Sequence, residues 1–177
     1  MAWRHRGRTP GRGLVQARVQ EGPRSILFAW GLLLEAFGDT LPRGTIDAYP
    51  CSVASWEQRW ATLPPDVQAA QRALEQRGRQ QAGRDPRMGV ALDLTDAEDL
   101  ALLRVFGPWT IYSEADDGHG LTLTTSDEGL ECNATVSPGE AVHLRAHLEQ
   151  RGLAFDDHFT FHPRRPPPAV RRHRSIP

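Results

Sequence analysis

The sequence predicts an α+β protein, in which a mostly antiparallel sheet of four or five strands packs as a two-layer sandwich against two helices. Segments with alternating apolar residues fill the C-terminal half of the chain. Two helix-start signals, a Thr or Ser followed three residues later by Glu, stand between them at 95–98 and 137–140. Helices and strands with one apolar side each bury that side by packing together, which favours the sandwich.

The N-terminal part of the chain predicts a basic arm followed by a buried helix. Residues 1–24 hold six arginines, one glutamate and no apolar periodicity, so we expect a disordered arm. The segment Ile26–Phe37 is strongly apolar and predicts a buried helix, with Ser25 as its cap and Gly38 as its end. It is too short to span a bilayer, and we expect no membrane role.

A helical region is predicted up to residue 83. From Trp56 to Leu74 the apolar residues recur at spacings of three and four, and Pro64-Pro65 divides this stripe into two helices. The polar stretch Gln76–Pro86 then predicts a linker. We therefore expect a helical region over 25–83 and an α+β domain over 88–162.

The α+β region is predicted to run strand, helix, three strands, helix, strand. Its first strand places Val90, Leu92 and Leu94 on one face. Thr95 is the expected cap of a helix that ends before Gly107-Pro108, and Ser137 begins a second capping box with Glu140.

The chain is predicted to end with a strand and a tail. Apolar and polar residues alternate from Leu153 to Phe161, which predicts a last strand with an aromatic face. Residues 163–177 are rich in Pro and Arg and contain no acidic residue, so we expect a disordered tail.

The net charge of −1 is unevenly distributed. Residues 1–24 and 163–177 each sum to +5, which leaves −11 for residues 25–162. Arginines on flexible ends can neutralise phosphates, so nucleic-acid association is one hypothesis, although the acidic body would repel a polyanion. The candidate residues are Arg4, Arg6, Arg8, Arg12, Arg164, Arg165, Arg171, Arg172 and Arg174.

Two pairs of histidines suggest a metal site. His143 and His147 lie four residues apart on a helix, and helical geometry turns both away from its apolar stripe, toward water. His158 and His162 fall on the last strand, on the far side of the sheet from the helix. Only the pair His143/His147 could chelate, and two surface ligands make a weak site. We therefore expect neither metal nor cofactor.

The loop 115–120 is the remaining chemical candidate. Asp116, Asp117 and His119 could form an enzymatic site, but Gly and Asp are also the residues that a hairpin turn needs. The sequence has no nucleophile elbow, phosphate-binding loop or dinucleotide fingerprint. We expect a turn, and the enzymatic alternative rests on these three residues.

These observations favour a non-catalytic protein-interaction or regulatory module. The two cysteines, Cys51 and Cys132, form no framework, so a cytoplasmic location is expected, and Cys132 falls on the inward side of a strand. The apolar Ile26–Phe37 helix is the expected interface for a protein partner or a second copy.

Overall fold

The structure is a computed structural model that describes residues 11–18, 23–50, 63–81, 85–126 and 131–163. These residues form an α+β fold around one seven-stranded antiparallel sheet with the strand order β3-β2-β4-β5-β6-β1-β7. The strands are β1 Gly13–Ala17, β2 Arg43–Ile46, β3 Val90–Asp93, β4 Ser113–Asp116, β5 Thr122–Ser126, β6 Glu131–Val136 and β7 Phe159–Pro163.

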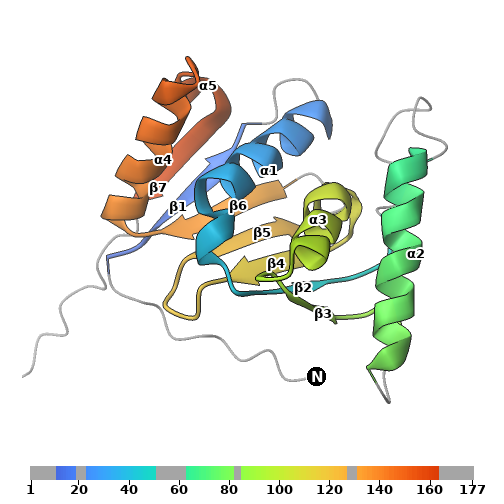
Figure 1. Cartoon of the computed structure of the whole chain (residues 1–177). Helices are drawn as coiled ribbons and strands as arrows, with labels where there is room; N and C mark the ends of the chain where they lie inside the picture. The colour runs from blue at the N-terminus through green and yellow to red at the C-terminus, as the bar shows by residue number, and fades with distance from the viewer. Residues whose placement is uncertain (1–10, 19–22, 51–62, 82–84, 127–130, 164–177) are drawn as a thin grey trace, which may run out of the picture.

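The helices gather on one face of the sheet and at one of its edges. Figure 1 shows α1 lying across the sheet between α3 and α4, while α2 stands beside the edge strand β3. The α-helices are α1 Pro23–Phe37, α2 Pro65–Gln80, α3 Ala97–Phe106, α4 Pro138–Gln150 and α5 Phe155–His158. Two short 3-10 helices, η1 Gly38–Thr40 and η4 Gly107–Trp109, follow α1 and α3.

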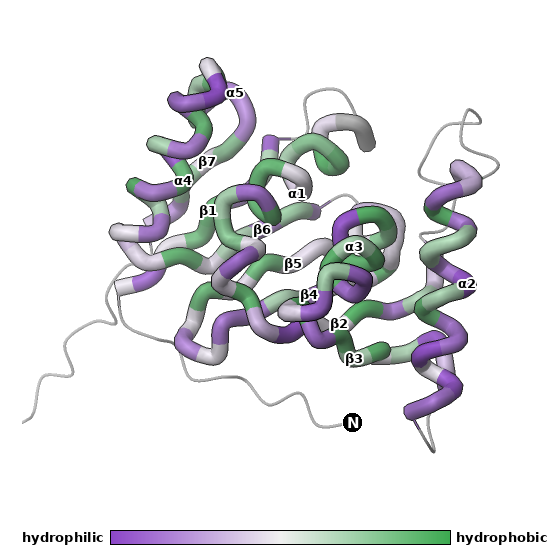
Figure 2. The backbone as a smooth tube through the Cα atoms, in the orientation of Figure 1, coloured by the Kyte–Doolittle hydropathy of each residue, from purple (hydrophilic) through white to green (hydrophobic). Residues whose placement is uncertain are grey.

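The core lies between the sheet and α1. Residues alternate between buried and half-buried along β1, β5 and β6, as expected for a sheet with helices on one face only. In Figure 2 the hydrophobic colour follows α1 and the central strands, whereas α2 is largely hydrophilic. Trp30 of α1 is fully buried and donates its indole N–H to the Leu103 carbonyl of α3. A Cβ on Gly107 would lie 2.8 Å from that nitrogen, so glycine permits this close packing.

Two strands lie outside the region where strands are predicted. The prediction of a disordered arm over 1–24 is wrong for residues 13–17, because β1 pairs with both β6 and β7. The prediction of a helical region over 25–83 is wrong for Arg43–Ile46, because β2 lies between β3 and β4. Both strands are short and place Gly13 or Gly44 on their inward face, so they show little hydrophobic alternation. They raise the sheet from the expected four or five strands to seven.

The predicted last strand begins too early. Residues Phe155–His158 form the helical turn α5, and β7 begins at Phe159. Phe155 and Phe159 are both buried, and a spacing of four residues suits a helical turn as well as a strand. Pro163 belongs to β7, so only residues 164–177 of the predicted tail lie outside the described residues.

The predicted linker Gln76–Pro86 is partly helical. α2 continues to Gln80, and at Gly78 it approaches Pro86 so closely that a Cβ would lie 1.9 Å from the Pro86 carbonyl oxygen. The Gln81 amide then donates to the Ala91 carbonyl at 3.2 Å and accepts the Ala91 N–H at 3.3 Å. A side chain thus satisfies part of the outer edge of β3.

Of the two predicted capping residues on helices α3 and α4, one is confirmed and one is wrong. The capping box of Ser137 and Glu140 is confirmed at the start of α4. α3 is capped by Asp96 and not by Thr95, whose hydroxyl binds Asp93. Cys132 is fully buried, which raises the pKa of its thiol. Cys51 lies outside the described residues. The same holds for the part of the predicted helical stripe from Trp56 to residue 62.

The prediction that Ser25 caps the first helix is also wrong. α1 begins at Pro23, two residues before the expected cap, and extends to Phe37 as predicted. Among its described side chains only Phe28 and Glu35 are exposed. This helix packs on β1, β6, α3 and α4 of its own chain. Its burial leaves little apolar surface for the interface that the sequence suggests.

Candidate functional site

The loop 115–120 is built as the hairpin turn between β4 and β5. One carboxylate oxygen of Asp117 accepts three backbone N–H groups, from His119 at 2.7 Å, Gly120 at 2.8 Å and Leu121 at 3.0 Å. Gly118 and Gly120 have positive φ angles of 77° and 121°, which this turn requires. Asp117 therefore shapes the backbone, and the turn interpretation accounts for its carboxylate.

The neighbouring Asp116 is held by an arginine of β2. Arg43 donates from Nε at 2.9 Å and from Nη2 at 2.7 Å to the same carboxylate oxygen, which also accepts the Gly118 N–H. This contact raises the pKa of the Arg43 guanidinium. Asp116 is 6% exposed, so Arg43 covers it from solvent. The two carboxylates proposed for catalysis thus have structural partners, and His119 alone presents an exposed side chain in this loop.

Arg12 is engaged inside the fold, which corrects its place among the nucleic-acid candidates. Its guanidinium donates to Glu140 at 2.7 Å and to the His119 carbonyl at 3.4 Å, and its side chain is only 11% exposed. A Cβ on Gly120 would lie 2.6 Å from Arg12 Nε, so the side chain lies directly against the β4–β5 turn. The other eight candidate arginines lie outside the described residues.

Of the pair His143/His147, His143 is exposed as predicted, whereas His147 is half-buried, and both lie against α1. His143 Nε2 lies 3.0 Å from the Ala36 carbonyl in the last turn of α1, and its ring lies 5.7 Å from that of Phe37. His147 Nε2 lies 3.7 Å from a Glu35 carboxylate oxygen. Helical geometry correctly predicts which side of α4 carries the two histidines. It cannot show that α1 packs beside that side.

The second pair, His158 and His162, is divided between two elements, because the last strand begins only at Phe159. His158 ends α5 and its ring lies 5.2 Å from that of Phe28, whereas His162 is exposed on β7. Within the described ranges, no three His, Cys, Asp or Glu side chains gather as metal ligands.

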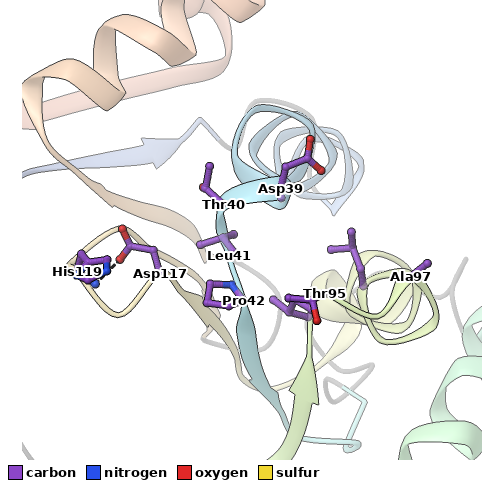
Figure 3. A pocket seen from close by; sticks show the side chains of 11 residues that line it. Asp39, Thr40, Leu41, Pro42, Thr95, Ala97, Asp117 and His119 are labelled. Atoms are coloured by element: carbon purple, nitrogen blue, oxygen red, sulfur yellow. Dashed lines mark hydrogen bonds between the residues drawn. The ribbon is translucent and has the colours of Figure 1, made fainter.

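An open cleft of about 700 Å³ lies beside the β4–β5 turn. Figure 3 shows the Leu41–Pro42 segment in its centre, with Asp117 and His119 on one side and Thr95 and Ala97 on the other. Asp39 stands at a third side, next to Thr40. The cleft therefore joins the end of α1, the start of α3 and the hairpin turn.

Rigid local contacts hold the walls of this cleft. The Thr40 hydroxyl donates to the Phe37 carbonyl at 2.7 Å, and Leu41 N–H donates to Gly38 O at 3.2 Å, which closes η1. On the opposite wall Thr95 donates from both its N–H and its hydroxyl to Asp93, which lowers the pKa of that carboxyl. The cleft is thus largely preformed.

The lining combines an apolar floor with a polar, acidic rim. Leu41 and Leu94 are buried at the floor, and Leu100 is half-buried beside them. Thr40, Thr95, His119 and Asp39 are exposed at the rim, and the half-buried Asp117 lies beside them. Residues 25–162, which include every residue of the cleft, have a net charge of −11. The cleft therefore suits a ligand with both apolar and cationic groups.

Sequence reasoning found one wall of this cleft and missed the others. Asp117 and His119 belong to the loop that the sequence singles out, but Asp39, Thr40 and Leu41 follow an apolar helix and show no motif. Their common location depends on β2 pairing with β4, a contact over about 70 residues of chain. The Gly-Asp-Thr-Leu-Pro sequence at 38–42 does mark a loop, which is the only local signal there.

Comparisons with known proteins give no relative. No model of a protein family matches this chain, and searches of curated proteins and of solved structures find no match. Within the part of the chain that the structure describes, no helix has the length and apolar character needed to span a membrane.

Proposed function

We propose that this protein is a non-catalytic binding module that docks a basic segment of a partner protein in the cleft between η1, α3 and the β4–β5 turn. This proposal rests on the lining of that cleft, in which acidic and hydroxyl side chains surround an apolar floor. An extended peptide can bury apolar side chains on such a floor while its cations meet the carboxylates at the rim.

The shape of the cleft favours a peptide segment over a small substrate. It is open to solvent and its walls come from three separate elements, so a short chain can lie across it. The hydroxyl groups of exposed Thr40 and Thr95 donate to Phe37 and Asp93, so their oxygens remain available on two walls to accept backbone N–H groups of a peptide. Asp39 and Asp117 supply negative charge at the rim.

The alternatives have less support from the described residues. The enzymatic hypothesis needs a free carboxylate near His119, but Asp117 binds three backbone N–H groups and Asp116 binds Arg43. The nucleic-acid hypothesis is weakened because Arg12, one of its candidate residues, binds Glu140. The acidic body also repels phosphates. The Ile26–Phe37 helix is covered by its own chain, so we place the docking surface at the cleft.

A peptide titration tests this proposal. The full chain, labelled with ¹⁵N, is titrated at about 20 mM salt with a ten-residue peptide containing three arginines and two leucines, and with the same peptide carrying glutamates in place of the arginines. We expect the amide shifts of Thr40, Thr95 and His119 to move with the basic peptide only. At about 0.3 M salt the binding weakens, because exposed charges are screened over a few ångströms.

Substitutions at the rim and far from it provide the matched control. Asp39→Asn removes one rim charge and is expected to weaken the basic peptide several-fold. Asp66→Asn removes the same charge from the exposed first turn of α2 and should leave the affinity unchanged. Equal effects of the two variants, or shifts spread over the surface without the cleft residues, would contradict a specific site.

A further inference from the structure

The β4–β5 turn, which forms one wall of the proposed docking cleft, is held between two arginines that do not line the cleft. Arg43 of β2 binds Asp116, and a Cβ on Gly118 would lie 3.3 Å from its Nη2. Arg12, directly before β1, approaches from the other side of the hairpin, where a Cβ on Gly120 would lie 2.6 Å from its Nε. Contacts outside the cleft therefore determine where this wall stands.

Arg12 ties the turn to the start of α4. Its Nη1 donates to Glu140 Oε2 at 2.7 Å, and its Nη2 donates to the His119 carbonyl at 3.4 Å. The same Glu140 oxygen accepts the Ser137 N–H at 2.6 Å and completes the capping box. A guanidinium holds its N–H donors in one rigid plane, so it can join two acceptors in a fixed geometry. One arginine thus links the helix start to the backbone of the turn.

The position of the turn matters because it directs the carboxylate of Asp117. Its oxygen Oδ1 accepts the three backbone N–H groups of His119, Gly120 and Leu121. No described residue donates a hydrogen bond to the other oxygen, Oδ2. Figure 3 shows Asp117 and His119 together on this wall of the cleft. A shift of the turn would therefore move the charge that meets the cations of the bound segment.

We propose that Arg12 is a positioning residue of the docking cleft. By holding the His119 carbonyl beside α4, it keeps the carboxylate of Asp117 in place at the rim. This inference rests on the proposed function, since it assigns a residue to the same site. Arg12 acts through the turn and not on the partner, and a wall that is fixed before binding lowers the cost of ordering it in the complex.

The test compares two full-length variants with the same change in charge, Arg12→Gln and Arg145→Gln. Arg145 of α4 lies over the Phe155 ring and near Asp156 of α5, so it is the matched control. We expect Arg12→Gln to bind the basic ten-residue peptide about three- to ten-fold more weakly than the natural chain. Arg145→Gln should bind it equally or slightly more tightly. In the free protein, the three amides bound to Asp117 should exchange faster in Arg12→Gln only.

Glu140→Gln provides a second variant, because glutamine can also complete a capping box with Ser137. It removes the charge that anchors Arg12, and denaturant unfolding shows whether each variant is folded. The double variant Arg12→Gln/Glu140→Gln has the net charge of the natural chain. We expect it to bind the peptide as weakly as Arg12→Gln alone, since the two changes break the same link.

The outcomes separate the two proposals. If the peptide binds Arg12→Gln and Arg145→Gln equally, the cleft is a docking site and Arg12 does not position it. A double variant that regains the natural affinity would show that net charge controls binding, and it would also overturn the role of Arg12. If the natural chain binds no basic peptide at the cleft, the proposed function fails and the positioning role fails with it.

Discussion

The helices α1 and α2 are nearly equal in length, with 15 and 16 residues, but they hold opposite places in the fold. α1 fills the centre of the helical layer and contacts β1, β6, α3 and α4, whereas α2 stands at the edge against α3 and β3. α2 buries four residues on one stripe, Val67, Ala70, Leu74 and Gly78. Apolar content, and not helix length, therefore determines which helix organises the core.

The largest expected difference between the two helices is the cost of a cavity. Leu33 of α1 and Leu74 of α2 are both fully buried. We expect Leu33→Ala to lower the free energy of unfolding by about 4 kcal/mol and Leu74→Ala by about 2 kcal/mol, because α2 can detach locally instead of unfolding the whole sheet. Denaturant unfolding with amide exchange on both variants measures this, and equal costs would show that α2 is as central as α1.

The close approach of α2 to Pro86 gives the next prediction. Gly78→Ala improves helix propensity, but its Cβ would meet the Pro86 carbonyl, so we expect a net loss of about 1–2 kcal/mol. The control is Gly139→Ala in α4, where the nearest atom to a new Cβ is 3.9 Å away, and which should be neutral or stabilising. A stable Gly78→Ala protein would mean that the loop at Pro86 yields easily.

Asp47 precedes Ala48, whose carbonyl accepts a hydrogen bond from Gln71 of α2. Substituting Asp47 is expected to change the stability of the fold by a smaller amount that depends on pH. Burial raises the pKa of Asp47, although its carboxylate accepts the Gly89 N–H at 2.6 Å. The folded state therefore holds its proton to a higher pH than the unfolded chain. The resulting stability is present at low pH and is lost as pH rises from the ordinary carboxyl range through the folded-state value.

The variant Asp47→Asn keeps the acceptor for Gly89 and removes the charge. We expect it to melt at a higher temperature than the natural protein at pH 7, with a shrinking difference toward pH 3 in calorimetry. Asp85→Asn serves as the opposite control, because contacts with Arg87 N–H and Tyr49 lower the pKa of Asp85. A lower melting temperature for Asp47→Asn at pH 7 would refute this assignment.

The smallest expected effect lies just after α2. Gln81→Ala deletes the two amide contacts to Ala91, and we expect a loss of about 0.5–1 kcal/mol. Its larger consequence is association, because the uncovered edge of β3 can pair with another chain. Light scattering at rising concentration checks this, with Gln80→Ala, one residue earlier at the exposed end of α2, as the control.

The sequence predicts the features that local chemistry decides. The Ser137 capping box, the end of α3 at Phe106 and the inward Val90 and Leu92 all follow from residues close together in the chain. The α+β class follows from these elements as well.

Long-range contacts explain what the sequence leaves unpredicted. β1 has five residues and takes its place only through β6 and β7, and β2 only through β3 and β4. His143 and His147 occupy the expected side of α4, yet their neighbour α1 is determined by the tertiary fold. Of the candidate cleft, only the turn at Asp117 could be identified in advance, because its other walls come from distant segments.

The position of β1 has a consequence for how the chain folds. Both neighbours of this strand are made late in synthesis, since Gln16 pairs with Asn133 on one side and with Thr160 on the other. While the ribosome is still working, β1 has no partner, and the loop that its pairing closes is more than 110 residues long. Such non-local pairing slows folding, and the final steps are expected to be the pairing of β1 with β6 and then of β7 with β1, its only neighbour in the sheet. Until then the half-built sheet presents an open edge at β6, where a nascent chain is most exposed to wrong partners.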